Sequence, residues 1–440
     1  MLAAARTFRC DFGSLKMGSA RGSSMRRYQS GRIGEGIGAL LFERLSRNVD
    51  TAFEVQWGDG TLRRFGPATA APAFRIVLRR PVVLGAAALR GHLALAEAYF
   101  DGALDVEGSF NAAMRVALDS GFEAESHLIN RIGNRLHELR RSNRDRSRAQ
   151  HNAEAHYALP NAFYRLWLDE PLMLYTCAYW TEGTRTLEQA QRNKCDHVCR
   201  KLQLARGETF IDMGCGFGGF LLRAHELTGA HGVGVNTTAE QVHHAREAIA
   251  QRGWSGALAV NLADFRDVPG QYDKLASIGV LEHAGRDQLA AALAAHARAL
   301  KPRGLGLLHF IGHAQPMETG LLIRKYVFPG GWIPALLDVV RELDRCGLEV
   351  LDVENLRRHY ALTLDAWAER FEAHWEAIRA LDPQRFDERF RRIWRTYLVG
   401  CAELFRMARP DTHLFQIVFS KGGATTAGNY PMTREFMYRP

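Results

Sequence analysis

Residues 208–226 read ETFIDMGCGFGGFLLRAHE, an apolar strand-like run followed by a glycine-rich turn and the start of a helix. Glycines let the backbone amides of such a turn approach a ligand closely at the N-terminus of a helix. Dinucleotide sites and S-adenosylmethionine sites both use a turn of this kind. The spacing Asp-x-Gly-x-Gly-x-Gly, with the acid at the end of the strand, favours S-adenosylmethionine. The predicted cofactor contacts in this turn are Asp212, Gly214, Cys215, Gly216 and Gly218.

The segment after the next apolar run supports the same interpretation. An NAD site would carry an acidic residue there to hold the ribose. Residues 232–235 instead run into Asn236 and Thr237, with Gln241 one turn later. We expect these amides and hydroxyls to hold the ribose or the methionine end of the cofactor.

The second part of the chain, from about residue 151, alternates short apolar runs with helix-like segments. Strands that alternate with helices form a parallel sheet covered on both faces, so the pattern predicts an α/β domain. The apolar runs are FIDMG, HGVGV, ALAVNLA, KLASIGV, GLGLLHFIG and FQIVFS.

The first part of the chain has a different pattern. Residues 31–49 have the spacing of an amphipathic helix, and residues 52–66 and 73–80 alternate apolar and polar side chains as half-buried strands do. Residues 92–108 predict a helix that stops at Asp101-Gly102 and a short strand or turn after it. These patterns indicate a small α+β domain. A chain of 440 residues is also longer than one core usually supports.

The composition, with 47% hydrophobic and 24% charged residues, is that of a globular protein. No apolar run is long enough to span a bilayer, and the N-terminus lacks the apolar core of a secretory signal, so we expect a cytoplasmic protein. The seven cysteines are scattered and odd in number, which indicates reduced thiols. Cys195, His197 and Cys199 lack the paired spacing of a zinc site, so we expect them to pack in the core and predict no metal site.

The net charge of +9 is concentrated in two segments. Residues 1–32 hold six Arg and one Lys against a single acid, and residues 131–150 hold seven Arg against two acids. Neither segment has an aromatic-interleaved or zinc-finger pattern, so an anionic membrane surface fits them at least as well as nucleic acid. The first segment could instead be a solvated, disordered arm, or a transit peptide with the true start at Met17 or Met25.

Eight segments in order between residues 151 and 406 resemble the cyclopropane-fatty-acyl-phospholipid synthase family, which includes the mycolic acid cyclopropane synthases. The front domain is similar to the small lipid-binding-like domain of that family through AEAYFDGALDVEG. The resemblance implies a Rossmann-like class I methyltransferase domain with a mostly parallel seven-stranded sheet. The eight segments are HNAEAHYALPNAFYRLWLD (151–169), LYTCAYW (174–180), IDMGCGFGG (211–219), SIGVLEHAG (277–285), LLHFIG (307–312), FPGGWIP (328–334), RHYALTLDAWAERF (358–371) and YLVGCAELFR (397–406).

The chemistry of this family explains why such residues occur together. Methyl transfer from a sulfonium to an alkene leaves a carbocation on the neighbouring carbon, and a base must take a proton from the new methyl group before a ring can close. In the family that base is thought to be a bound bicarbonate. The resemblance implies that the bicarbonate is held by the backbones of Cys177 and Ile311 and by the side chains of Glu282, His309 and Tyr360. It also matches Cys401 to a cysteine once considered an active-site residue.

The resemblance extends the cofactor site as well. It adds Tyr175 and Thr176, and it places Asp264 and Phe265 near the adenine. Rings such as those of Tyr157 and Tyr164 could stabilise the developing cation, or they could simply pack.

Several of these assignments have a structural alternative. His309 inside an apolar strand is more often a satisfied core histidine, Tyr360 could be a packing residue, and the mechanism needs no thiol from Cys401. The chain also departs from the family pattern. Asn236, Thr176 and Phe217 stand in place of Thr, Ser and Trp, which keeps polarity or bulk, whereas Leu281 in place of Phe would remove a ring near the reaction centre.

The sequence therefore predicts an enzyme that transfers the methyl group of S-adenosylmethionine to the cis double bond of a phospholipid acyl chain and closes a cyclopropane ring. The alternative product is a methyl-branched or methylene-bearing chain. We expect a peripheral protein at the inner, anionic membrane face and no nucleic-acid partner, and a homodimer is compatible with the sequence. The predicted segments are a basic arm (1–32), a small α+β domain (33–125), a basic linker (126–150), the methyltransferase domain (151–425) and a C-terminal tail (426–440).

Overall fold

The computed structural model describes residues 38–47, 49–80, 85–87, 90–120, 128–141, 159–408, 411–425 and 430–438. The predicted basic arm over residues 1–32 and residues 142–150 of the predicted linker lie outside these ranges. Within them, no helix is both long enough and apolar enough to cross a membrane.

The larger domain is built on one seven-stranded sheet with the order β10-β11-β9-β8-β5-β6-β7. Its strands pair in parallel except β11, which runs antiparallel to both of its neighbours. The predicted α/β class with a mostly parallel seven-stranded sheet is confirmed. The strands are β5 (Thr209–Met213), β6 (His231–Asn236), β7 (Leu258–Leu262), β8 (Tyr272–Ile278), β9 (Leu300–His313), β10 (Glu349–Asn355) and β11 (Thr412–Ser420).

Strand β10 is the only strand of the large sheet that our sequence analysis did not single out. Its sequence EVLDVEN carries three acidic residues, and only Asp352 is buried. It lies at the sheet edge, where one side of the strand has no neighbour. An edge strand therefore lacks the continuous apolar run that marks a strand buried on both faces.

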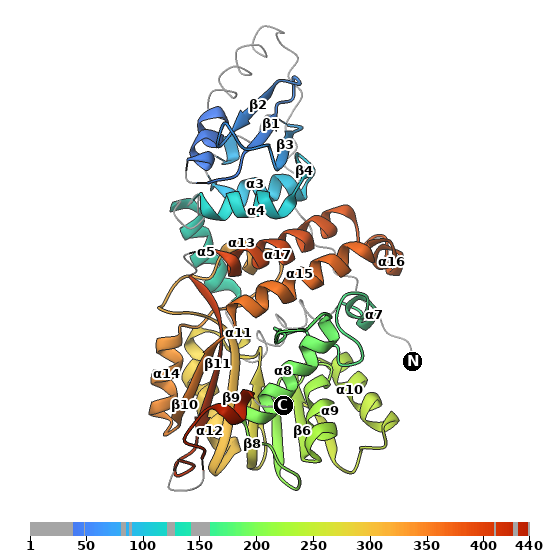
Figure 1. Ribbon diagram of the computed structural model, residues 1–440, viewed down its shortest axis with the longest axis vertical. Coiled ribbons are helices and arrows are strands. Elements are labelled where there is room, and N and C mark those ends of the chain that lie inside the picture. The colour runs from blue at the N-terminus through green and yellow to red at the C-terminus, as the bar shows by residue number, and fades with distance from the viewer. Residues whose placement is uncertain are drawn as a thin grey trace, which may run out of the picture.

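Helices cover both faces of this sheet (Figure 1). One face packs against α8 (Leu187–Lys201), α9 (Gly219–Thr228) and α10 (Ala239–Gln251). The other packs against α12 (Leu289–Ala299) and α14 (Leu336–Arg345). The shorter helical segments are α7 (Asn161–Arg165), α11 (Leu281–Ala284), α13 (Leu321–Tyr326), α16 (Trp375–Leu381), α18 (Glu435–Tyr438) and the 3-10 turns Phe265–Asp267 and Arg286–Gln288.

The small domain contains a four-stranded sheet with the order β2-β1-β3-β4. The sheet and its helices fall within residues 33–125, where the sequence predicted a small α+β domain. Its elements are a helical segment over residues 38–46, β1 (Phe53–Gln56), β2 (Leu62–Phe65), β3 (Phe74–Leu78), α3 (His92–Phe100), β4 (Leu104–Gly108) and α4 (Phe110–Asp119). Stacked and edge-on phenylalanine rings, Phe53 and Phe74 among them, fill its core.

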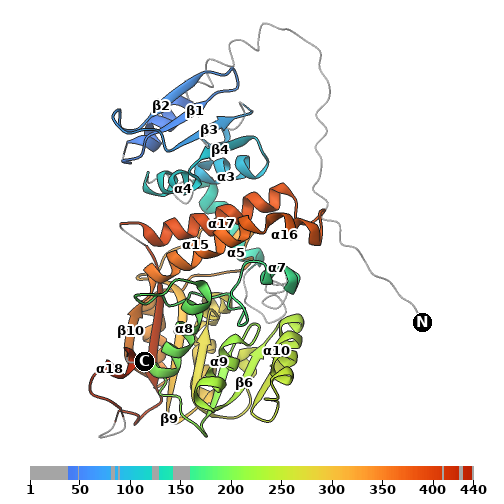
Figure 2. The ribbon, with the colours of Figure 1, turned by 45° about the vertical axis from the view of Figure 1, so that its right-hand side comes forward.

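Two long helices, α15 (Arg357–Ala373) and α17 (Glu388–Arg406), lie between the small domain and the large sheet (Figures 1 and 2). Helix α17 packs against α3 and α4, and its Val399 belongs to the small domain's core. On its other side α17 packs against α15. Helix α17 thus joins the two domains, together with α13, whose Lys325 and Tyr326 donate to Glu97 of α3 at 2.7 and 2.8 Å.

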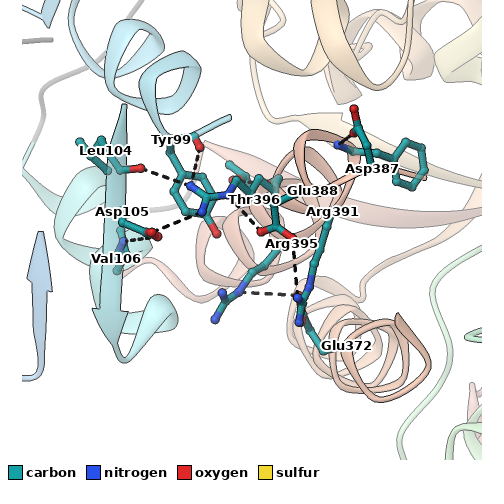
Figure 3. A network of polar contacts seen from close by, with 12 residues as sticks. Tyr99, Leu104, Asp105, Val106, Glu372, Asp387, Glu388, Arg391, Arg395 and Thr396 are labelled. Atoms are coloured by element: carbon teal, nitrogen blue, oxygen red, sulfur yellow. Dashed lines mark hydrogen bonds and ion pairs between the residues drawn. The ribbon is translucent and has the colours of Figure 1, made fainter. Parts of the chain in front are cut away.

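Polar contacts also hold α17 against the small domain, and Figure 3 shows part of them. Arg392 donates to the backbone carbonyls of Tyr99 and Leu104 at 2.9 and 3.3 Å and pairs with Asp105 at 3.3 Å. The buried Glu403 accepts hydrogen bonds from Asn111 and Arg115 of α4 at 3.2 and 3.0 Å, and pairs with Arg406 of its own helix.

Two predicted boundary segments are part of the folded body. Residues 128–141 of the predicted linker form helix α5, whose Asn134 is buried against the segment before α13. In the predicted tail, Met437 of α18 is buried, and its carbonyl accepts from Arg200 of α8 at 3.0 Å. Helix α5 carries four Arg among its 14 residues and α18 is only four residues long, so their packing was not evident from the sequence.

Replacing Glu403 by Gln should lower the free energy of unfolding by roughly 1–3 kcal/mol, because a buried carboxylate that accepts from Arg115 and Asn111 loses its charge. Chemical denaturation would measure the change. The control is Glu388→Gln on the same helix, since Glu388 is 58% exposed and exposed ion pairs contribute little. Equal stability of the two variants would contradict the role given to Glu403.

Candidate active site

A cavity of about 280 Å³ opens at the carboxyl ends of the central strands. Ligands bind at this edge of open α/β sheets, because the ends of parallel strands and their loops meet there. All predicted site residues except Gly218 line this cavity. They are Tyr175, Thr176, Cys177, Asp212, Gly214, Cys215, Gly216, Asn236, Thr237, Gln241, Asp264, Phe265, Glu282, His309, Ile311, Tyr360 and Cys401.

The glycine-rich turn between β5 and α9 needs its glycines for two different reasons. Gly214, Gly216 and Gly218 all have positive φ, a conformation that other residues rarely adopt. A Cβ on Gly216 would meet nothing within 4 Å, so this residue leaves room for a ligand. A Cβ on Gly218 would lie 2.9 Å from Cβ of Ala245 in α10. Gly218 therefore serves helix packing rather than the cavity wall, which differs from the prediction.

The polar residues after β6 form a connected group. The Asn236 amide donates to Oε1 of Gln241 at 2.8 Å and to the carbonyl of Gly216 at 3.2 Å. This pairing fixes the loop after β6 against the glycine-rich turn. Asp264 is held differently, because its carboxylate accepts two hydrogen bonds from the Arg266 guanidinium at 2.8 and 2.7 Å.

Lys194 is a cavity residue that our sequence analysis did not single out. It is fully buried in α8, and its ammonium donates to Oγ1 of Thr176 at 2.7 Å. Burial raises the pKa of Asp212 to about 7, and the positive charge of Lys194 opposes that rise. The helical period could have predicted that Lys194 is buried, because it lies one turn from Gln191 and Val198 on the buried face of α8.

Glu282 lies in the first turn of α11, directly after β8. Its Oε1 accepts a hydrogen bond of 2.7 Å from the backbone N–H of Ile311 on β9. Its Oε2 is buried and has no partner among the described residues. Burial raises the pKa of Glu282 to about 7.

His309 lies on β9, side by side with Gln416 of β11 in the strand register. The Gln416 amide nitrogen lies 3.1 Å from Nδ1 of the imidazole. Nε2 is buried and has no partner in the part of the chain that the structure describes. Burial, with the nearby positive charge of Lys194, holds the pKa of His309 well below its usual range. Only one of the two ring nitrogens is therefore satisfied, unlike in an ordinary core histidine.

Helices α15 and α17 contribute the aromatic part of the wall. Tyr360 of α15 and Tyr397 of α17 line the cavity, and the Tyr397 hydroxyl lies 3.0 Å from that of Tyr175. Enclosure raises the pKa of Cys401 to about 12, so this thiol stays protonated and is a poor nucleophile. Tyr164 does not line the cavity but packs behind it, while Tyr157 lies outside the described residues.

Leu281 is buried in the core beneath the sheet and is not part of the cavity wall. The expectation that a leucine here removes a ring from the reaction centre is therefore wrong for this chain. The Leu281 side chain packs among apolar residues of the strands and of the helices that cover this face of the sheet.

The Cys195, His197 and Cys199 side chains lie in the protein interior. His197 is hydrogen-bonded to Glu354 at 2.8 Å and to the Met437 carbonyl at 3.0 Å. The six cysteines in the described ranges are free.

The cavity therefore has two chemically different ends. One end has the glycine-rich turn, Asn236 and Lys194, which suit a cofactor with amino-acid and ribose groups. At the other end an acceptor, Oε2 of Glu282, and the ring nitrogen Nε2 of His309 lack partners in the described chain. Buried polar groups normally have partners, so this pair indicates a small polar ligand.

Comparison with known proteins gives the family of the chain. A sequence model described as mycolic acid cyclopropane synthetase matches residues 144–417, and one for a domain of unknown function matches residues 40–128. A probable fatty acid methyltransferase of Pseudomonas putida is 36% identical over 87% of this chain and 95% of its own length. The cyclopropane-fatty-acyl-phospholipid synthase of Escherichia coli is 35% identical over 76% of this chain and 84% of its own.

Solved structures agree with this result. The cyclopropane synthase MmaA2 from Mycobacterium tuberculosis is 31% identical, with a TM-score of 0.57 over 62% of this chain and 98% of its own. The mycolic acid cyclopropane synthase CmaA1, solved as a complex with SAH and CTAB, gives the same values. The matching range holds both the glycine-rich turn and the Glu282–His309 end of the cavity. The chain therefore belongs to the mycolic acid cyclopropane synthetase family and is an S-adenosylmethionine-dependent methyltransferase.

Proposed function

We propose that this enzyme methylates the cis double bond of an unsaturated phospholipid acyl chain and closes a cyclopropane ring. The observation that carries the proposal is that Glu282, His309, Ile311 and Tyr360 share one cavity with the glycine-rich cofactor turn. S-Adenosylmethionine supplies the methyl group, and the alkene supplies the electron pair. The protein must then exclude water from the carbocation and hold a base beside the new methyl group.

Bicarbonate fits the second end of this cavity. Its hydroxyl can donate to Oε2 of Glu282, and a charged oxygen can accept from Nε2 of His309. The Ile311 N–H, one of the implied bicarbonate contacts, donates to Glu282 instead. Bound there, bicarbonate would supply the base that takes the proton from the new methyl group. Glu282 holds its own position through the Ile311 N–H and so presents its second oxygen in a fixed direction.

The aromatic wall suits the charge that develops on the substrate. The faces of Tyr175, Tyr360 and Tyr397 can stabilise a cation at close range. The apolar side chains of Ile323, Phe328 and others beside them suit an acyl chain. This combination supports a lipid substrate over a small polar one.

A methyl-branched product is the second candidate, because the relative from Pseudomonas putida is described as a probable fatty acid methyltransferase. The two products differ in which proton leaves the cation. Glu282 and His309 line the same cavity as the cofactor turn, and a base held there favours loss from the new methyl group, and hence ring closure.

Helix α5 is the proposed membrane contact. Ile132 and Leu136, one turn apart, are 52% and 47% exposed, and Arg135 beside them is exposed as well. Apolar and basic side chains on one exposed helix suit an anionic bilayer surface. Asn134 of the same helix is buried and donates to the carbonyl of Thr319.

The position of α5 relative to the cavity supports this role. Arg324 of α13 donates to Asn134 at 2.9 Å, and both Arg324 and Thr319 line the cavity. A membrane held by α5 would thus lie next to one wall of the cavity. An acyl chain would have a short path from the bilayer to the cofactor.

Phospholipids from cells that produce this protein should gain one CH₂ unit on unsaturated chains, with a cyclopropane signal in the proton NMR spectrum. Glu282→Gln should abolish the gain and leave S-adenosylmethionine affinity unchanged by calorimetry, because the amide keeps the shape but loses the charge. Glu376→Gln on the exposed side of α16 is the control. A methyl-branched product would support the second candidate instead, and full activity of Glu282→Gln would contradict the assigned role.

The kcat at saturating S-adenosylmethionine and fixed bicarbonate should fall as the pH is lowered through about 7. The reason is that Glu282, with its pKa raised to about 7, becomes protonated and presents a donor where an acceptor is required. Assays stopped at fixed times and analysed by lipid mass spectrometry would measure kcat as a function of pH. A flat profile between about pH 8 and pH 6 would show that the ionised form is not needed.

The double substitution Ile132→Ser and Leu136→Ser should weaken binding to phosphatidylglycerol vesicles by roughly tenfold or more, since two apolar side chains no longer enter the bilayer. Co-sedimentation at several salt concentrations would measure it. Leu337→Ser on α14 is the matched control, because Leu337 is 59% exposed but lies on a helix that covers the sheet. Equal loss in both proteins would argue against a specific docking helix.

A further inference from the structure

Gln416 is a buried residue that has no role in the proposed reaction as described above. It lies on β11, the one antiparallel strand of the large sheet, and its side chain is fully buried. It is not part of the cavity wall. Its amide reaches His309 from behind, on the side of the imidazole away from the orphan Nε2.

We propose that Gln416 is a positioning residue that fixes the tautomer of His309, so that Nε2 carries the proton and donates into the cavity. Gln416 turns its amide nitrogen, which can only donate, toward Nδ1 at 3.1 Å, while its Oε1 is buried with no partner among the described residues. Nδ1 must then be the acceptor, and a neutral imidazole has its single proton on the other nitrogen. The strand register, which pairs Gln416 with His309, holds the two side chains on the same face of the sheet.

The tautomer decides which ligand the cavity can hold. With the proton on Nε2, His309 offers a donor next to the acceptor Oε2 of Glu282. A ligand with both an anionic oxygen and a hydroxyl satisfies the two together. With the proton on Nδ1, both groups would be acceptors, and an oxyanion would be repelled.

A neutral His309 is consistent with an Nδ1 that accepts from Gln416 and an Nε2 that carries the proton. Its ring is buried, and the cationic side chains of Lys194 and Lys201 disfavour a second proton. A charged imidazole would donate from both nitrogens, and the Gln416 amide would have to turn its unpartnered oxygen toward Nδ1 to keep the contact. Gln416 therefore selects one of two neutral forms rather than a charge state.

The inference rests on the proposed function only for the identity of the ligand, because the tautomer can be observed without substrate. Long-range nitrogen–proton NMR of histidine-labelled full-length protein distinguishes a protonated from an unprotonated ring nitrogen. His309→Gln identifies the signals among the 17 histidines. We expect Nδ1 of His309 to be unprotonated and Nε2 protonated in the wild-type protein.

Two substitutions test whether Gln416 determines the tautomer of His309. Gln416→Glu places a carboxylate, which only accepts, against Nδ1, and should move a proton to Nδ1 with little change in volume. Gln416→Leu removes the donor and should leave a mixture of tautomers. Ser420→Ala, a buried polar residue further along β11 and away from the cavity, should leave the His309 signals unchanged.

Activity gives a second readout. Gln416→Leu should lower kcat by about 10- to 100-fold, the usual effect of losing a partner that orients a functional histidine, without changing the affinity for S-adenosylmethionine. The bicarbonate concentration at half-maximal rate should rise. A protonated Nδ1 in the wild-type protein, or an unchanged tautomer in Gln416→Leu, would overturn the inference. If the tautomers behave as expected but no lipid is modified, the proposed function fails and the role of Gln416 stands.

Discussion

The hydrogen bond from the Ile311 amide to Glu282 joins the ends of two neighbouring parallel strands, and the reactive end of the cavity is built around it. It holds a buried carboxylate in one orientation and leaves one oxygen for a ligand. Strand β9 also carries His309, two residues before Ile311, so both face the same cavity. The pairing of β8 with β9 thus brings an acid from the short helix after β8 and an imidazole on β9 to the same cavity.

The antiparallel strand β11 supports this arrangement from the other side. It lies between β9 and β10 and brings Gln416 against His309. The cofactor end is held by different means, because the glycine-rich turn and the Asn236–Gln241 pair come from consecutive parts of the chain. One end of the site is therefore local in sequence, whereas the other is assembled from strands far apart.

Helix α17 connects this chemistry to the small domain. Tyr397 and Cys401 line the cavity, while Val399 and Glu403 on the opposite side of the same helix pack against the small domain. The helix cannot move at one surface without affecting the other. The small domain and the cavity are thus coupled through α17, and α13 forms a second link, because its Tyr326 donates to Glu97 of α3 at 2.8 Å while its Arg324 lines the cavity.

The sequence by itself determined the α/β class, the cofactor turn and the predicted polar residues of the cavity, because these depend on short-range patterns and on motifs in a fixed order. Only the tertiary structure decided the roles of Gly218, Leu281, Lys194 and Gln416. A glycine in a turn has the same sequence signature whether it admits a ligand or a helix, and the direction of Leu281 depends on how a short helix sits on the sheet. Lys194 and Gln416 act through partners 18 and 107 residues away, and such pairings are set by packing and strand register rather than by local sequence.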